Sequence, residues 1–98
     1  MLLDSVPKDL DFSEIKAGLL AMSEVIDVFD LHIWQTGSEN RMLSAHIITK
    51  ELDANERMRL IAKIQEYLEE KYHVGHATLQ VISEKEAEMY NLACQHCN

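Results

Sequence analysis

Basic residues and glycines are scarce in this chain of 98 residues, and each shortage excludes a class of function. Nine lysines and arginines stand against 17 aspartates and glutamates, which gives a formal net charge of −8. This charge repels phosphate backbones and anionic headgroups and is compatible with attracting cations, so nucleic acid is not expected as a partner. With three glycines in total, the chain also lacks the glycine-rich loops that cradle phosphates.

Long apolar runs and a disulfide framework are also missing. No window approaches the ~18 to 20 consecutive apolar residues that a membrane span needs, and the start lacks the basic-then-apolar pattern of a signal peptide. Both cysteines fall within the last five residues, unlike the cysteines of small secreted domains. We therefore expect one soluble globular domain in a reducing, cytosolic setting, with no direct membrane insertion.

Two helices are predicted from capping patterns and apolar spacing. D-x-x-E patterns beginning at Asp11 and at Asp53 place carboxylates where a helix start has unpaired amides. Apolar residues at helical spacing follow each pattern, which predicts helices over residues 13–22 and 54–72. Gly75 is the expected stop just beyond the second helix.

Three strands are predicted from apolar–polar alternation, over residues 24–35, 41–50 and 77–83, with a turn over 36–41 joining the first two. In the later strands, the residues expected to face the helices are Leu43, Ala45, Ile47, Ala77, Leu79 and Val81. In the first strand, the expected helix-facing residues are Val25, Phe29, Leu31 and Ile33, with Asp27 as an exception. The open face then receives Ile26, Val28, Asp30, His32 and Trp34.

The resulting order αββαβ, over residues 1–83, predicts an α+β sandwich of the ferredoxin-like, metallochaperone-like kind. Its three-stranded sheet carries two helices on one face and lacks the first strand of the full βαββαβ unit. Residues 1–12 are expected to form an irregular lead-in, and residues 84–98 a cysteine-containing tail that can begin as a short helix.

The most specific local pattern is Cys94-Gln95-His96-Cys97. Two thiolates three positions apart can bind one Zn²⁺ from a turn, with further ligands supplied from elsewhere in the fold. From this motif alone, a metal site, a redox-active pair and a frayed tail with two free thiols all stay open.

Three more histidines are candidate ligands because of their predicted places in the sheet. His32 and His46 share the open face, and His76 begins the third strand. His73 is explained more simply by the dipole at the helix end. Ser44, His46 and Asp30 resemble a hydrolase triad on paper, but no nucleophile elbow or oxyanion loop accompanies them, so we do not expect an enzyme.

Trp34 and Met42 are predicted on the sheet face that no helix covers. Self-association is the commonest way to bury such a pair, and an exposed aromatic beside a turn is the alternative.

The segments LLDSVPKDLDFSEIKAGLL, DVFDLHIWQTGS, LSAHIIT and HATLQV, followed by a Cys pair, resemble the cytosolic C-terminal domain of the cation diffusion facilitator family of divalent-metal transporters. The resemblance covers nearly the whole chain and implies a domain that follows the last transmembrane helix at the cytoplasmic face of a membrane. It also implies a homodimer whose metal occupancy favours the transport-competent state of the transmembrane part, exporting zinc or a similar ion. Residues 1–12 would then lead in from the membrane.

The resemblance also implies a ligand set. His46 matches the histidine of the family's SAH-type motif, Cys94 and Cys97 match a terminal Cys pair found in some members, and His76 stands where members often place histidine. His32 and His96 are further candidates.

Three departures from the family pattern, namely Phe29, Gly75 and Ile82, argue against a bridging, carboxylate-rich site. They favour a softer site for Zn²⁺ that would also accept Cd²⁺, Co²⁺ or Cu ions.

Two other functions stay in play. A free-standing soluble metallochaperone of similar fold would carry M-x-C-x-x-C in its first loop, which this chain lacks. A metal-indifferent dimerisation module would need only the apolar open face.

Overall fold

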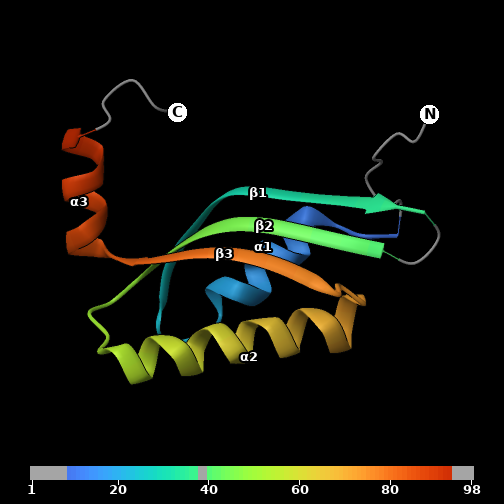
Figure 1. Cartoon of the computed structure of the whole chain (residues 1–98), viewed down its shortest axis with the longest axis horizontal. Helices are drawn as coiled ribbons and strands as arrows, with labels where there is room; N and C mark the ends of the chain where they lie inside the picture. The colour runs from blue at the N-terminus through green and yellow to red at the C-terminus, as the bar shows by residue number, and fades with distance from the viewer. Residues whose placement is uncertain (1–8, 38–39, 94–98) are drawn as a thin grey trace.

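The computed structural model describes residues 9–37 and 40–93, with side chains up to residue 89. The order αββαβ is confirmed, and a third helix follows it (Figure 1). The elements are α1 (Phe12–Leu20), β1 (Val25–Thr36), β2 (Asn40–Thr49), α2 (Ala54–Tyr72), β3 (His76–Ser83) and α3 (Glu84–Ala93). In the described part of the chain, no helix is long and apolar enough to cross a membrane.

The helix boundaries follow from local hydrogen bonds. Asp11 caps α1 by accepting from the backbone amides of Ser13 and Glu14. Asp53 and Glu56 form a complete reciprocal capping box at the start of α2. At its other end, the left-handed residue that closes α2 is His73, with φ of 58°, so the expectation that Gly75 supplies the stop is wrong.

The sheet has the order β1-β2-β3, with β2 antiparallel to β1 and parallel to β3. Both α1 and α2 cover one face of it, which confirms the predicted sandwich (Figure 1). The core between the layers is formed by Ile15, Leu19, Val25, Val28, Ile33, Leu43, Ala45, Ile47, Leu60, Ile64, Leu68, Tyr72, Val74 and Val81. The opposite face carries no helix from the described elements over its middle.

The predicted faces of β1 are wrong in its central part. Val28 is fully buried and Phe29 is 38% exposed, the reverse of the expectation. The physical reason is two irregularities of register, one between Val25 and Asp27 and one between Phe29 and His32. Each bulge adds a residue and exchanges the two faces, so the alternation is correct again at Ile33.

Helix α3 leaves the sheet on the side away from α2 (Figure 1). Its start is fixed by a second reciprocal box, in which the Ser83 amide donates to Glu86 Oε1 at 2.8 Å and the Glu86 amide donates to Ser83 Oγ at 3.1 Å. Arg57 also donates to Glu86 at 2.9 Å. These bonds hold the pKa of the Glu86 carboxyl below its usual value. The S-x-x-E pattern at residues 83–86 was available in the sequence and predicts this start.

Candidate metal site on the open sheet face

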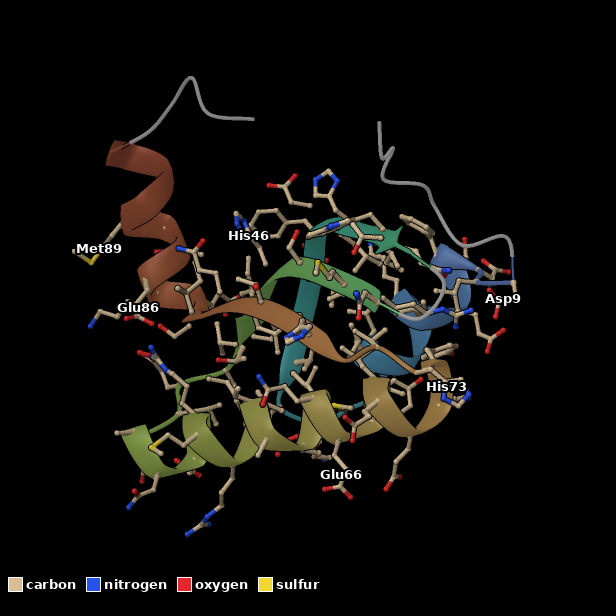
Figure 2. All side chains as sticks on the ribbon, turned by 45° about the vertical axis from the view of Figure 1, so that its right-hand side comes forward. Asp9, His46, Glu66, His73, Glu86 and Met89 are labelled. Atoms are coloured by element: carbon tan, nitrogen blue, oxygen red, sulfur yellow. The ribbon has the colours of Figure 1, made fainter. Side chains whose placement is uncertain are left out.

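The central strand β2 sets the positions of the candidate ligands on the open face. His46 is the register partner of Phe29 on β1 and of Gln80 on β3. His32 lies opposite Ser44, one same-face step along the strand from His46. Figure 2 shows His46 projecting from the sheet on the side away from α2. The structure thus brings His46 and His32 to one face, as predicted.

Asp30 is a titratable neighbour of His46. The distance between His46 Nδ1 and Asp30 Oδ2 is 3.5 Å, and the two side chains are 32% and 46% exposed. Both line a shallow hollow of about 360 Å³, together with His32, Ser44, Ala45, Thr78 and Gln80. An imidazole and a carboxylate at the edge of a hollow are a donor set that suits Zn²⁺.

Phe29 packs directly on the imidazole of His46. The ring centroids are 4.8 Å apart and the planes meet at 87°, an edge-to-face arrangement. The first bulge of β1 places this aromatic ring on the open face. Regular alternation had predicted it on the opposite face, against the helices. Phe29 therefore restricts the movement of His46, although it cannot itself bind a metal.

His76 lies at the other end of the same face. It is the register partner of Met42, which is four residues from His46 along β2. At ~3.3 Å per residue, this separation is about 13 Å. His76 instead borders a second hollow, of about 490 Å³, beside Glu66 and Glu69. Within one chain, His76 and His46 are too far apart to bind the same ion.

The remaining predicted ligands, Cys94, His96 and Cys97, lie outside the described residues. Within residues 9–37 and 40–93, no three histidine, cysteine, aspartate or glutamate side chains converge on a point that could hold a metal ion. The described part of the open face therefore offers a metal only an incomplete site, in which His46 stays the predicted nitrogen ligand. Sulfur ligands would have to come from the tail.

Asp30 was missed as a candidate ligand. Alternation along the strand predicts Asp30 on the open face with His32, so its side of the sheet could be read from the sequence. The proximity of Asp30 to His46 could not be predicted from the sequence, because this proximity depends on the bulge between Phe29 and His32.

Two apolar residues stand beside this site. Trp34 and Met42 are register partners near the hairpin end of the sheet, and both are half-buried. Ile26, with 44% exposure, and Phe29 extend the exposed apolar surface of β1.

An arginine joins the lead-in to the hairpin end of the sheet. Arg41 donates to both carboxylate oxygens of Asp9 at 2.8 Å and to the carbonyl oxygen of Tyr72 at 2.8 Å. The Arg41 guanidinium holds the pKa of the Asp9 carboxyl below its usual value. Both bonds to Asp9 come from Arg41 Nη2 and the bond to Tyr72 comes from Nη1, so the guanidinium links Asp9 to β2 and to the end of α2.

Comparison with known proteins gives a family match over most of the chain. The model of the family described as "cation efflux protein, cytoplasmic domain" matches residues 7–84. Metal tolerance protein 1 of Arabidopsis thaliana is 33% identical over 82 residues, which are 83% of this chain and 20% of that protein. Metal cation efflux system protein CzcD of Cupriavidus metallidurans is 31% identical over 80 residues, which are 82% of this chain and 25% of that protein. The chain thus spans only a fifth to a quarter of these relatives.

A solved structure agrees with the sequence match. The metal-bound C-terminal domain of the CzcD transporter superposes with a TM-score of 0.64 and 28% identity, covering 74% of this chain and 97% of that domain. The predicted fold is confirmed by this likeness.

Proposed function

This chain belongs to the cation efflux protein family, of which it is the cytoplasmic domain, and we propose that it is the metal-sensing, dimerising regulatory domain of a zinc-type divalent cation efflux transporter. The single observation that carries the proposal is the placement of His46. Its imidazole stands on the sheet face that α1 and α2 leave uncovered, at the edge of a hollow and beside a carboxylate. The similar C-terminal domain of the CzcD transporter is metal-bound, which supports a metal-binding role for this chain.

The ligands we propose are His46 with the thiolates of Cys94 and Cys97. Imidazole and thiolate are ligands that Zn²⁺ prefers, and they also accept Cd²⁺ and Co²⁺. Helix α3 leaves the sheet on the side away from α2 (Figure 1), which is also the side to which His46 projects (Figure 2). His32 and His96 are further candidate ligands of the same ion. His76 is not proposed as a ligand of this ion, because it borders a separate hollow.

The dimer we propose forms through the open face. Among residues 9–37 and 40–93, no helix covers the face that carries Trp34, Met42 and Phe29, and a second copy of the chain would remove this apolar surface from water. Metal bound at the same face would stabilise the dimer, because the metal would bind the dimer more tightly than the monomer. The Arg41–Asp9 ion pair would pass this change to the lead-in and to a transmembrane part of the same transporter.

Calorimetric titration with Zn²⁺ tests the proposed site. We expect the wild-type chain to bind Zn²⁺, and we expect the double variant Cys94→Ser/Cys97→Ser to bind it far more weakly. His46→Gln should show a comparable loss, while His73→Gln, at the end of α2, is the matched control and should bind as the wild type does. Indistinguishable binding by the double variant would refute the role of the tail.

Measurements of the oligomeric state, of bound metal and of metal transfer distinguish the alternatives. A dimer that is unchanged by chelator and holds no metal by elemental analysis would favour the metal-indifferent module. Release of bound Zn²⁺ to a partner protein by a monomeric chain would favour the metallochaperone.

A further inference from the structure

The two edges of the sheet differ in how they are protected against pairing with another chain. In natural proteins, exposed edge strands are commonly protected by bulges, charged side chains or prolines. Edge strand β1 has two bulges and carries Asp27 and Asp30. At the opposite edge (Figure 1), β3 keeps an unbroken register with β2 from His76 to Ser83, and its sequence HATLQVIS contains no Lys, Arg, Asp, Glu or Pro. The edge of β3 therefore lacks the features that usually prevent strand addition.

Two hydrogen bonds show which backbone groups of β3 lie on its free edge. The hydroxyl of Thr49, on β2, donates to the carbonyl oxygen of Ile82 at 3.5 Å, so this carbonyl faces β2. The next amide, that of Ser83, donates to a carboxylate of α3 at 2.8 Å and faces away from β2. Because backbone groups alternate in direction along a strand, the N–H and C=O groups of Ala77 and Leu79 also face away. Within residues 9–37 and 40–93, no strand lies beyond β3 to pair with them.

The accessible part of this edge lies beside a hollow. Val81 is only 7% exposed, whereas Ala77 and Leu79 are half-buried, so the edge is open over residues 76–80. The start of β3 also borders the hollow of about 490 Å³, whose other wall is α2. A strand edge beside a helix, with a hollow between them, is a geometry by which domains bind an extended peptide as an additional strand. The residues of α2 that line the hollow are Gln65, Glu66 and Glu69.

The charge of the hollow determines which segment fits it. Glu66 and Glu69 are exposed, and neither forms an ion pair with another described residue. Lys63 of the same helix is directed elsewhere, 3.6 Å from Glu24. Two copies of the chain joined by their β3 edges would bring the same carboxylates together, which a net charge of −8 on each copy makes still less favourable. Charge complementarity therefore favours a segment rich in Lys or Arg.

We propose that the free edge of β3 and the hollow beside it bind an extended basic segment of a partner protein, which adds a fourth strand to the sheet. The backbone groups of Ala77 and Leu79 pair with this segment, and its Lys or Arg side chains reach Glu66 and Glu69. The proposed metal site and the proposed dimer lie on the open face of the sheet. This interaction therefore goes beyond the proposed function and requires neither of them.

Hydrogen exchange of the full chain, followed by NMR in the presence of chelator, tests the strand pairing. The probe is the peptide acetyl-Lys-Val-Lys-Val-Lys-Val-amide, and acetyl-Glu-Val-Glu-Val-Glu-Val-amide is its charge-reversed control. With the basic peptide bound, the amides of Ala77 and Leu79 should exchange at least about tenfold more slowly, because they gain acceptors. The amides of Thr78 and Gln80, which face β2, should change little, and those of β1 should not change.

Two double variants of equal net charge test the role of the carboxylates. Glu66→Gln/Glu69→Gln removes the two that line the hollow, whereas Glu51→Gln/Glu70→Gln removes two exposed carboxylates that do not line it. Binding is measured from the amide shifts during peptide titration. The wild type should bind the basic peptide at least about tenfold more tightly than the acidic one, and Glu66→Gln/Glu69→Gln should bind it about fivefold more weakly than the control variant does.

A basic peptide that does not bind, that binds without slowing exchange at Ala77 and Leu79, or that binds both double variants equally would overturn the proposal. Slow exchange of these two amides that is present without peptide and increases with chain concentration would assign the edge to a second copy, and would overturn the proposal as well. Because these titrations are carried out in chelator, a chain that binds no Zn²⁺ would overturn the proposed function alone.

Discussion

The capping box at Ser83 makes a quantitative prediction about the tail. Helix α3 has 10 residues, shorter than the ~12–15 residues at which an isolated helix becomes marginally stable. Among residues 84–89 of this helix, Ala87 is the one buried side chain, with 9% exposure. Ser83→Ala removes the acceptor of the Glu86 amide and leaves the bond from the Ser83 amide to Glu86 intact. Loss of such a cap costs about 1 kcal/mol, so local opening of α3 should increase about fivefold.

Hydrogen exchange measures this opening directly. In Ser83→Ala, the amides of α3 should exchange about fivefold faster, and those of α2 should exchange as in the wild type. Ser13→Ala is the control, because Ser13 is an exposed serine in the first turn of α1. Unchanged exchange in α3, or an equal increase in every helix, would refute the argument that this box holds the helix. If the tail thiolates bind metal from an ordered α3, zinc affinity should fall by the same factor.

Three further predictions concern β1 and the carboxylates. Asp30→Gly should stabilise the metal-free chain by about 0.5–1 kcal/mol in urea unfolding, because glycine adopts the φ of 51° without strain, and a loss of stability would contradict this. Phe29→His places a second imidazole beside His46, so in the Cys94→Ser/Cys97→Ser background it should restore measurable zinc binding by calorimetry; no recovery would contradict the adjacency. Hydrogen bonds and ion pairs lower the pKa values of Asp9, Glu24 and Glu86 in the folded chain, so their contribution to stability is present above the ordinary values of 3.8 and 4.5 and should be lost as the pH falls through the lower folded values. Urea unfolding between pH 7 and pH 3 measures this loss, and Arg41→Gln should reduce the part due to Asp9.

The sequence predicted the parts of the fold that depend on local periodicity and caps. The bounds of α2 are as expected, because Asp53 and Glu56 fix its start and its apolar stripe runs without interruption to Tyr72. The alternation in β2 and β3 also holds, with Leu43, Ala45 and Ile47 buried. These elements are regular, so a period of two or 3.6 residues describes them completely.

The middle of β1 was not predictable in the same way. An alternation rule has no means of placing an extra residue, and the two bulges exchange Val28 and Phe29 between the faces. The same bulges create the neighbourhood of His46, since they bring Phe29 and Asp30 to it. The candidate site is therefore partly hidden from the sequence, because its geometry depends on an irregular backbone and on pairing between strands that are distant along the chain.

The coupling between zinc binding and dimerisation is the central claim, and sedimentation equilibrium of the wild-type chain tests it most directly. With one equivalent of Zn²⁺, the dimer dissociation constant should be at least about tenfold lower than in chelator, which corresponds to about 1.4 kcal/mol of coupling. The variant Cys94→Ser/Cys97→Ser should lose this difference, and Glu70→Gln, at an exposed position of α2, should keep it. A dissociation constant for the wild type that is the same with zinc and with chelator would contradict the account.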